Sequence, residues 1–125
     1  MPDPFEHAIV RLVPDVAREE LINVGAIVYC PSLRWLRARI AFDEARAVAL
    51  FPRIDIEAVR AHLDAIPRAC DGEGPFAELD QGERFRFLVA PKNTIIQTSC
   101  AHGGLTDDPS AALDRIIDTL VRAGA

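Results

Sequence analysis

The segment Leu21–Cys30 restricts the fold of this chain more than any other stretch. Its even-numbered positions are all apolar, whereas Asn23 and Tyr29 occupy odd-numbered ones. Because side chains on a strand point alternately to opposite faces, this pattern predicts a β-strand. Residues 5–13 and 34–43 alternate in a similar way on either side of it. The short connections between these segments favour an antiparallel three-stranded meander.

Helical patterns follow the meander. Asp43 can cap a short helix through Phe51, and Asp55 can cap a second helix that Pro67 limits. The clearest pattern is the last one, in which Asp108 is the predicted cap and a proline occupies the first helical position.

Residues 81–90 fit two structures. Arg84-Phe85-Arg86-Phe87 alternates as a strand would, but Phe85, Leu88 and Val89 also form a helical stripe. Asp80 and Glu83 have the spacing of a capping box, which favours the helix.

Strands and helices are segregated along the chain, which predicts the α+β class. We expect one domain over residues 1–125, with an antiparallel sheet of about four strands. These are the N-terminal meander and a later strand at 94–99, with the helices packed on one face of the sheet.

Composition excludes several classes of protein. The chain has 14 basic and 19 acidic residues and a net charge of −5, which disfavours sequence-independent binding to nucleic acid. No signal peptide or membrane-length apolar run is present, so a cytoplasmic protein without membrane contact is expected. Three cysteines without a C-x-x-C spacing predict neither a disulfide framework nor a metal site, and no motif implies a cofactor.

One local segment departs from the acidic average. Residues 84–105 contain three basic residues and no carboxylate. Donors without neighbouring acids are what an anion site requires. The candidate ligand-binding residues are Arg84, Arg86, Lys92, Gln97 and His102. The alternative is a solvated basic edge of the molecule.

Two other groups of residues allow both a functional and a structural interpretation. Cys100 and His102 are two apart, so on a strand they could form a nucleophile–base pair, although a strand-end cysteine is more often part of a core. Arg37 and Arg39 beside Trp35 could stack on a base or a peptide, or simply cover an amphipathic edge. No catalytic residues are assigned.

A polar cluster is expected on one face of the meander. If the first two strands pair, His7 and Arg11 share a face, as do Asn23 and Tyr29 on the neighbouring strand. This cluster could be a polar pocket on the sheet, or Arg11 could clamp the loop between the two strands.

Three motifs resemble those of domain-of-unknown-function family 3037. The motifs are Glu20-Leu21-Ile22-Asn23-Val24-Gly25, Arg84-Phe85-Arg86-Phe87 with Asn93-Thr94-Ile95-Ile96-Gln97, and His102-Gly103-Gly104-Leu105-Thr106-Asp107-Asp108-Pro109. The chain has Phe87 where a tryptophan is common in that family. The resemblance implies a small bacterial protein, often encoded beside HipA-like serine/threonine kinases, and it assigns no activity.

These observations favour a non-enzymatic interaction or regulatory module over an enzyme. A HipA-like kinase and a second copy of the chain are the expected partners. The alternative is an enzyme or ligand-binding domain for a phosphorylated or nucleotide-like molecule, which would use the basic 84–105 segment.

Overall fold

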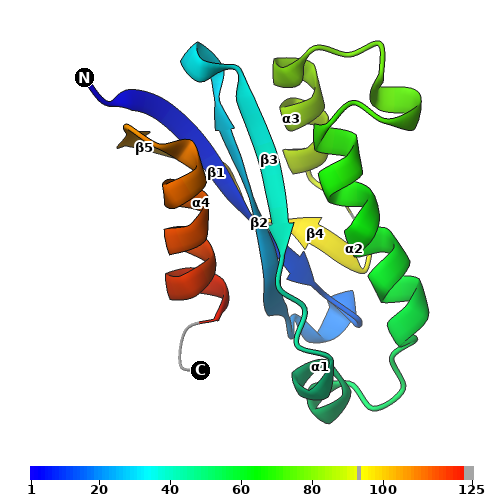
Figure 1. Cartoon of the computed structure of the whole chain (residues 1–125). Coiled ribbons are helices and arrows are strands. Elements are labelled where there is room, and N and C mark those ends of the chain that lie inside the picture. The colour runs from blue at the N-terminus through cyan, green and yellow to red at the C-terminus, as the bar shows by residue number, and fades with distance from the viewer. Residues whose placement is uncertain (93, 123–125) are drawn as a thin grey trace.

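The computed structural model describes residues 1–92 and 94–122; Asn93, in the second motif, lies outside them. Its strands and helices alternate little along the chain (Figure 1). The strands are β1 Asp3–Leu12, β2 Ile22–Cys30, β3 Trp35–Ile40, β4 Ile96–Thr98 and β5 His102–Thr106. The helices are α1 Glu44–Leu50, α2 Ile56–Cys70, α3 Gln81–Val89 and α4 Pro109–Ile116, and α4 continues as a π-helical turn, η4 Ile117–Val121.

All pairings in the sheet are antiparallel, which confirms the predicted α+β class and the N-terminal meander. The strand order is β3-β2-β1-β4, and β5 pairs with the first half of β1 on the same side as β4. Gly103 and Gly104 therefore lie inside a fifth strand, beyond the four strands that the sequence predicts. A Cβ at Gly104 would lie 2.7 Å from the Phe5 ring, so any larger residue there would force this ring to move.

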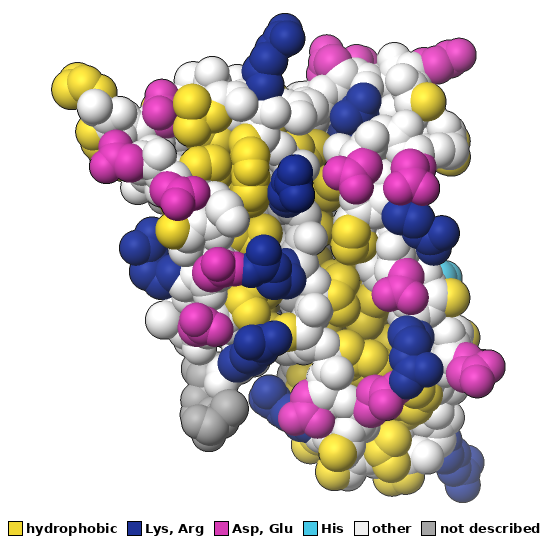
Figure 2. Space-filling view, in the orientation of Figure 1, with side chains coloured by type: hydrophobic (Ala, Val, Ile, Leu, Met, Phe, Trp, Pro, Cys, Tyr) yellow, Lys and Arg dark blue, Asp and Glu magenta, His cyan; other side chains and the backbone are white. Residues whose placement is uncertain are grey.

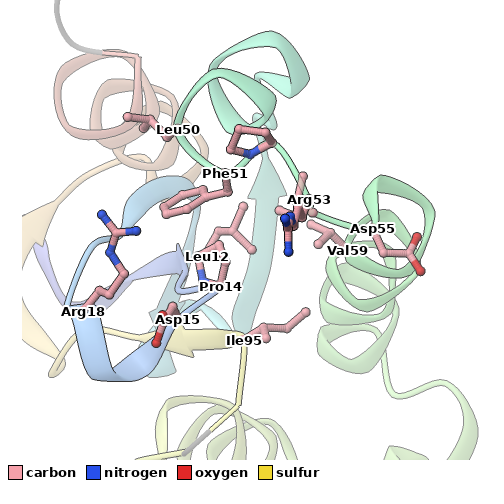
Figure 3. Close-up of a pocket in the computed structure, with 12 residues that line it drawn as sticks. Leu12, Pro14, Asp15, Arg18, Leu50, Phe51, Arg53, Asp55, Val59 and Ile95 are labelled. Atoms are coloured by element: carbon pink, nitrogen blue, oxygen red, sulfur yellow. The ribbon is translucent and has the colours of Figure 1, made fainter.

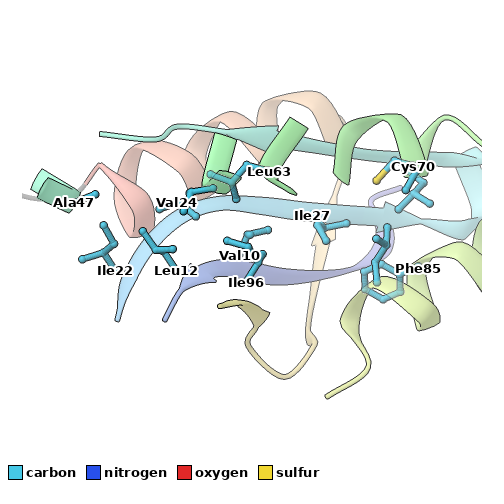
Figure 4. Close-up of a cluster of buried hydrophobic side chains, with 14 residues drawn as sticks. Val10, Leu12, Ile22, Val24, Ile27, Ala47, Leu63, Cys70, Phe85 and Ile96 are labelled. Carbon is cyan, nitrogen blue, oxygen red and sulfur yellow. The ribbon is translucent and has the colours of Figure 1, made fainter. Parts of the chain in front are cut away.

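The helices lie on both faces of the sheet, which corrects the expectation that they share one face. Helices α2 and α3 cover one face, where they bury the larger of two hydrophobic clusters, including Leu12, Val24, Leu63 and Phe85 (Figure 4). Helix α4 covers the opposite face, where Leu113 and other residues of its buried stripe pack on β1 and β2 (Figure 1). The sequence predicts the last helix, but an amphipathic pattern carries no information about which face of the sheet the helix covers.

A β-bulge in β2 separates the two halves of this strand. Val10 of β1 pairs with Gly25, but the next residue, Arg11, pairs with Asn23, so Val24 is the extra residue. Ile22 and Val24 consequently face α2 and α3, whereas Ala26 and Val28 face α4. The predicted unbroken apolar face at even-numbered positions is therefore divided between the two sides of the sheet.

Helix boundaries follow the capping residues seen in the sequence. Asp43, Asp55 and Asp108 each accept a hydrogen bond from a backbone amide of the first helical turn. Asp80 and Glu83 form a complete capping box, which confirms the predicted helix at 81–90. The prediction that Pro67 limits the second helix is wrong. Pro67 lies in the last turns of α2, which continues to Cys70.

Candidate functional site

The side chains of the basic 84–105 segment are held by different partners. Arg84 lies on α3, and its Nε donates to the Phe76 carbonyl at 3.2 Å while its Nη1 donates to the Cys70 carbonyl at 3.3 Å. The same guanidinium packs against Gly72, where φ is +78° and a Cβ would approach it to 2.7 Å. Arg84 therefore fixes the connection between α2 and α3.

Lys92 caps the C-terminus of α3. Its Nζ donates to the carbonyls of Phe87, Leu88 and Ala90 at 2.8, 3.0 and 3.1 Å. These carbonyls lie at the C-terminal end of the helix, where, among the described residues, only the Phe87 carbonyl also accepts from a backbone amide, that of Ala90 at 3.4 Å. A cation there therefore supplies missing hydrogen bonds and complements the helix dipole. Burial lowers the pKa of Lys92 from its ordinary value.

Gln97 and His102 also have local partners. The Gln97 Nε2 donates to the Thr94 carbonyl at 2.9 Å. His102 of β5 lies opposite His7 of β1, with their ring centroids 5.6 Å apart. Burial, and then the neighbouring His102, lower the pKa of His7.

Arg86 forms the strongest of these contacts. Its guanidinium donates two hydrogen bonds to the Glu6 carboxylate, at 3.0 and 2.7 Å, and this pairing raises the pKa of Arg86. The contacts of the five candidate residues thus serve the backbone and the strand–helix packing. An anion site formed by all five remains a prediction to which these contacts lend no support.

The predicted polar cluster on the meander is divided between the two faces. His7, Arg11 and Asn23 lie on the α4 side, where the Asn23 Nδ2 donates to the Leu120 carbonyl at 2.9 Å. Tyr29 lies on the other side, packed against Phe85 with ring centroids 5.2 Å apart and the ring planes tilted by 35°. The bulge in β2 causes this division, because it shifts the alternation between Asn23 and Tyr29 by one residue.

Cys100, for which the sequence left both a nucleophilic and a core role open, is exposed between β4 and β5, whereas Cys30 and Cys70 are buried. Burial, reinforced by Asp71, raises the pKa of the Cys70 thiol to about 12, so this thiol is unreactive at neutral pH. Within residues 1–92 and 94–122, no cluster of three potential metal ligands is found.

Tyr29 and Arg86, which come from two different predicted groups, meet at one surface. They line a shallow groove of about 810 Å³ along α3, with Leu79, Gly82 and Phe87. We call this surface the α3 groove. Phe87 is 55% exposed and packs edge-on against Phe76, with ring centroids 5.2 Å apart. The sequence pattern did not mark Phe87 as a candidate site residue, and it did not identify Glu6 as the partner of Arg86.

The α3 groove continues on the other side of the helix start. A second hollow of about 520 Å³ shares Tyr29, Pro31 and Gly82 with it and adds Arg34 and Gln81. The Gln81 Nε2 donates to the Arg34 carbonyl at 2.9 Å, which ties α3 to the turn between β2 and β3. Arg34 has a left-handed backbone, with φ of +52°.

A separate cleft of about 650 Å³ lies near the far end of β1, between α1 and α2 (Figure 3). Its floor is apolar and includes Leu12 and Phe51, while Arg18 and Arg53 stand on opposite sides of them in Figure 3. Asp15 and Asp55 also border the cleft, and each accepts a hydrogen bond from a nearby backbone amide. The lining carries two positive and two negative charges, so it favours neither anionic nor cationic ligands.

These features define a small α+β domain with shallow surface grooves of mixed polarity. The sequence model described as "Protein of unknown function (DUF3037)" matches residues 7–121, and the chain belongs to this family. The predicted resemblance is thereby confirmed over nearly the whole chain. No curated protein and no solved structure matches it. Among the described residues, no helix is long and apolar enough to cross a membrane.

Proposed function

We propose that this protein is a non-enzymatic interaction module that binds a partner protein at the α3 groove. The observation that carries the proposal is the exposed ring of Phe87 beside Tyr29 and Arg86. Tyrosine, phenylalanine and arginine are enriched at protein interfaces, and tyrosine and arginine are also enriched at their energetic hot spots. A 55% exposed phenylalanine beside a groove is available to insert into a partner.

The groove is also held in shape before any partner binds. The Glu6–Arg86 pair fixes α3 against β1, and the Asp80–Glu83 capping box fixes the start of the helix. Tyr29 rests on the fully buried Phe85. A surface that is already ordered loses little conformational freedom on binding, which favours affinity.

The partner that we propose is a HipA-like serine/threonine kinase, because members of this family are often encoded beside such kinases. Binding to it would make this protein a regulator or an adaptor of the kinase, and would place it in the cytoplasm. Self-association is the other interaction that the groove could serve.

Co-expression with a HipA-like kinase tests the proposal. We expect the two chains to co-purify, and we expect Phe87→Ala to weaken the complex by about tenfold or more, as hot-spot truncations do. Leu105→Ala is the matched control, because Leu105 is 66% exposed but lies on β5, away from the groove. No complex at micromolar concentrations, or equal loss with both variants, would contradict the proposal.

A further inference from the structure

The free edge of β3 is a second surface, independent of the α3 groove. In the strand order β3-β2-β1-β4, β3 is the outer strand, and it pairs with β2 along its whole length from Trp35 to Ile40. Figure 2 looks onto this edge and shows basic side chains along it, with hydrophobic side chains on both sides. An unpaired edge is a template for an additional strand.

The register identifies the backbone groups that point outward. The Ala41 amide donates to the Val24 carbonyl at 2.8 Å, so Ala41 is a hydrogen-bonded position of the β2–β3 ladder. In an antiparallel pair these positions alternate. Arg37 and Arg39 therefore direct their amides and carbonyls towards β2. Ala38 and Ile40 direct theirs outward, where the described part of the chain offers them no hydrogen-bond partner.

The exposed side chains on one face of this edge are positively charged. Arg37 and Arg39 are exposed on the α4 side of the strand, and the exposed Arg34 directly precedes it. Residues 31–42 contain no carboxylate. Arg39 forms an ion pair with Asp114 of α4, whereas the Arg37 guanidinium lies 5.9 Å from the centre of the Trp35 ring. Among the described residues, no carboxylate pairs with Arg37.

A second copy of the chain fits this edge poorly. In a symmetric antiparallel pair of β3 strands, directly opposite residues lie on the same face, so their numbers are both odd or both even. In the two registers in which the two β3 strands overlap most, an arginine of one copy then lies opposite an arginine of the other copy on the α4 side. Like charges directly opposite each other destabilise such a pair.

We propose that the β3 edge binds an extended acidic segment of a partner protein as an additional strand of the sheet. Acidic side chains of that segment lie opposite Arg37 and Arg39. These are the non-hydrogen-bonded positions of the new pair, where opposing side chains are closest. The intervening residues of the segment exchange backbone hydrogen bonds with Ala38 and Ile40. Their side chains face the α2 side, next to the apolar side chains of the same two residues.

A short synthetic peptide that alternates glutamate with valine tests this assignment, with fluorescence anisotropy at low salt as the measurement. We expect it to bind, and we expect its lysine–valine counterpart not to bind. Arg37→Glu should weaken binding by about tenfold or more, because it replaces an attraction with a repulsion. Arg53→Glu is the matched control, since it makes the same change of charge at an exposed arginine away from β3 and should leave binding within about twofold.

The backbone can be tested separately from the charge. N-methylation of the valines should abolish binding, because their amides face β3, whereas N-methylation of the glutamates should leave these hydrogen bonds intact. Hydrogen exchange should show new protection at the Ala38 and Ile40 amides. Ala38→Pro removes an outward-facing amide and should also abolish binding. If this variant does not fold, the methylated peptides answer the same question.

Several results would overturn the proposal. They are no binding of the acidic peptide, equal binding by the Arg37→Glu variant, equal effects of the two methylation patterns, and protection of amides other than those of β3. Self-association of the chain that Ala38→Pro abolishes would identify a second copy as the occupant instead. Loss of the kinase complex with Phe87→Ala but unchanged peptide binding would show that the two surfaces act independently.

Discussion

Arg86 of α3 and Glu6 of β1 are joined by two hydrogen bonds, of 3.0 and 2.7 Å, across 80 residues of sequence. The pair connects the first strand to the helix that borders the α3 groove. It lies at the surface, with the Arg86 side chain 60% and the Glu6 side chain 32% exposed. Its main effect is therefore to position the arginine and the helix rather than to stabilise the whole fold.

A double-mutant cycle with Arg86→Ala and Glu6→Gln should measure this coupling. We expect an interaction energy of about 0.5–1 kcal/mol in urea unfolding, which decreases with added salt because the pair is exposed. A coupling near zero would mean that the two bonds do not hold α3 against β1.

Gly104→Ala should destabilise the protein by about 1–3 kcal/mol, because the added methyl group overlaps the Phe5 ring and forces it to move. Gly103→Ala is the control. Its Cβ would meet nothing closer than the Phe5 carbonyl oxygen at 3.9 Å, so its effect should be much smaller. Urea unfolding at neutral pH measures both. Equal effects would show that the cost comes from the loss of glycine in β5 and not from the ring.

Stability should decrease as the pH falls below about 6.5, the ordinary pKa of histidine, through His7. Burial and His102 lower the pKa of His7 in the folded state. The unfolded chain therefore binds a proton first as the pH falls, which favours unfolding. Above the ordinary pKa both states are neutral at this position, and no such effect remains.

Urea unfolding between mildly acidic and neutral pH measures this dependence. His7→Gln should flatten it, and His102→Gln should reduce it by removing the second cause of the shift. His62→Gln changes a histidine outside this pair and should preserve the dependence. An unchanged dependence in the His7→Gln variant would contradict the assignment.

Thiol labelling should distinguish Cys100 from the other two cysteines. Cys100 is exposed, whereas Cys30 and Cys70 are buried, and burial raises the pKa of Cys70 to about 12. In the folded protein we expect iodoacetamide to modify one site, Cys100, and to modify all three in denaturant. Mass spectrometry of the native protein with and without Cys100→Ser measures this. Rapid labelling of Cys70 in the folded state would contradict its buried placement.

Local patterns predicted most of the secondary structure, because their causes are local. The Asp80–Glu83 spacing correctly predicted a helix over residues 81–90, since a capping box forms between residues of one turn. Pro67 shows the limit of such signals. Proline in the last turns of α2 removes a hydrogen bond without ending the helix, because the packing of Ala69 and Cys70 in the core holds the chain in place.

The candidate sites were predicted less well, because they depend on contacts between distant residues. The composition of the 84–105 segment revealed a local excess of basic residues, but not that Arg84 binds the carbonyls of Cys70 and Phe76. Likewise, strict alternation predicted that Tyr29 and Asn23 share one face of the sheet. The bulge at Val24 places them on opposite faces of the sheet.

The sequence by itself determined the antiparallel meander, the capped helices and the membership of the family, because these depend on periodicity, on neighbouring residues and on motifs. Only the tertiary structure decided that α4 covers the opposite face from α2 and α3, and that β3 is the free edge. An apolar stripe requires a partner but does not specify which one. The partner is chosen by the packing of the whole chain, and this choice left the arginines of β3 exposed at the edge of the sheet.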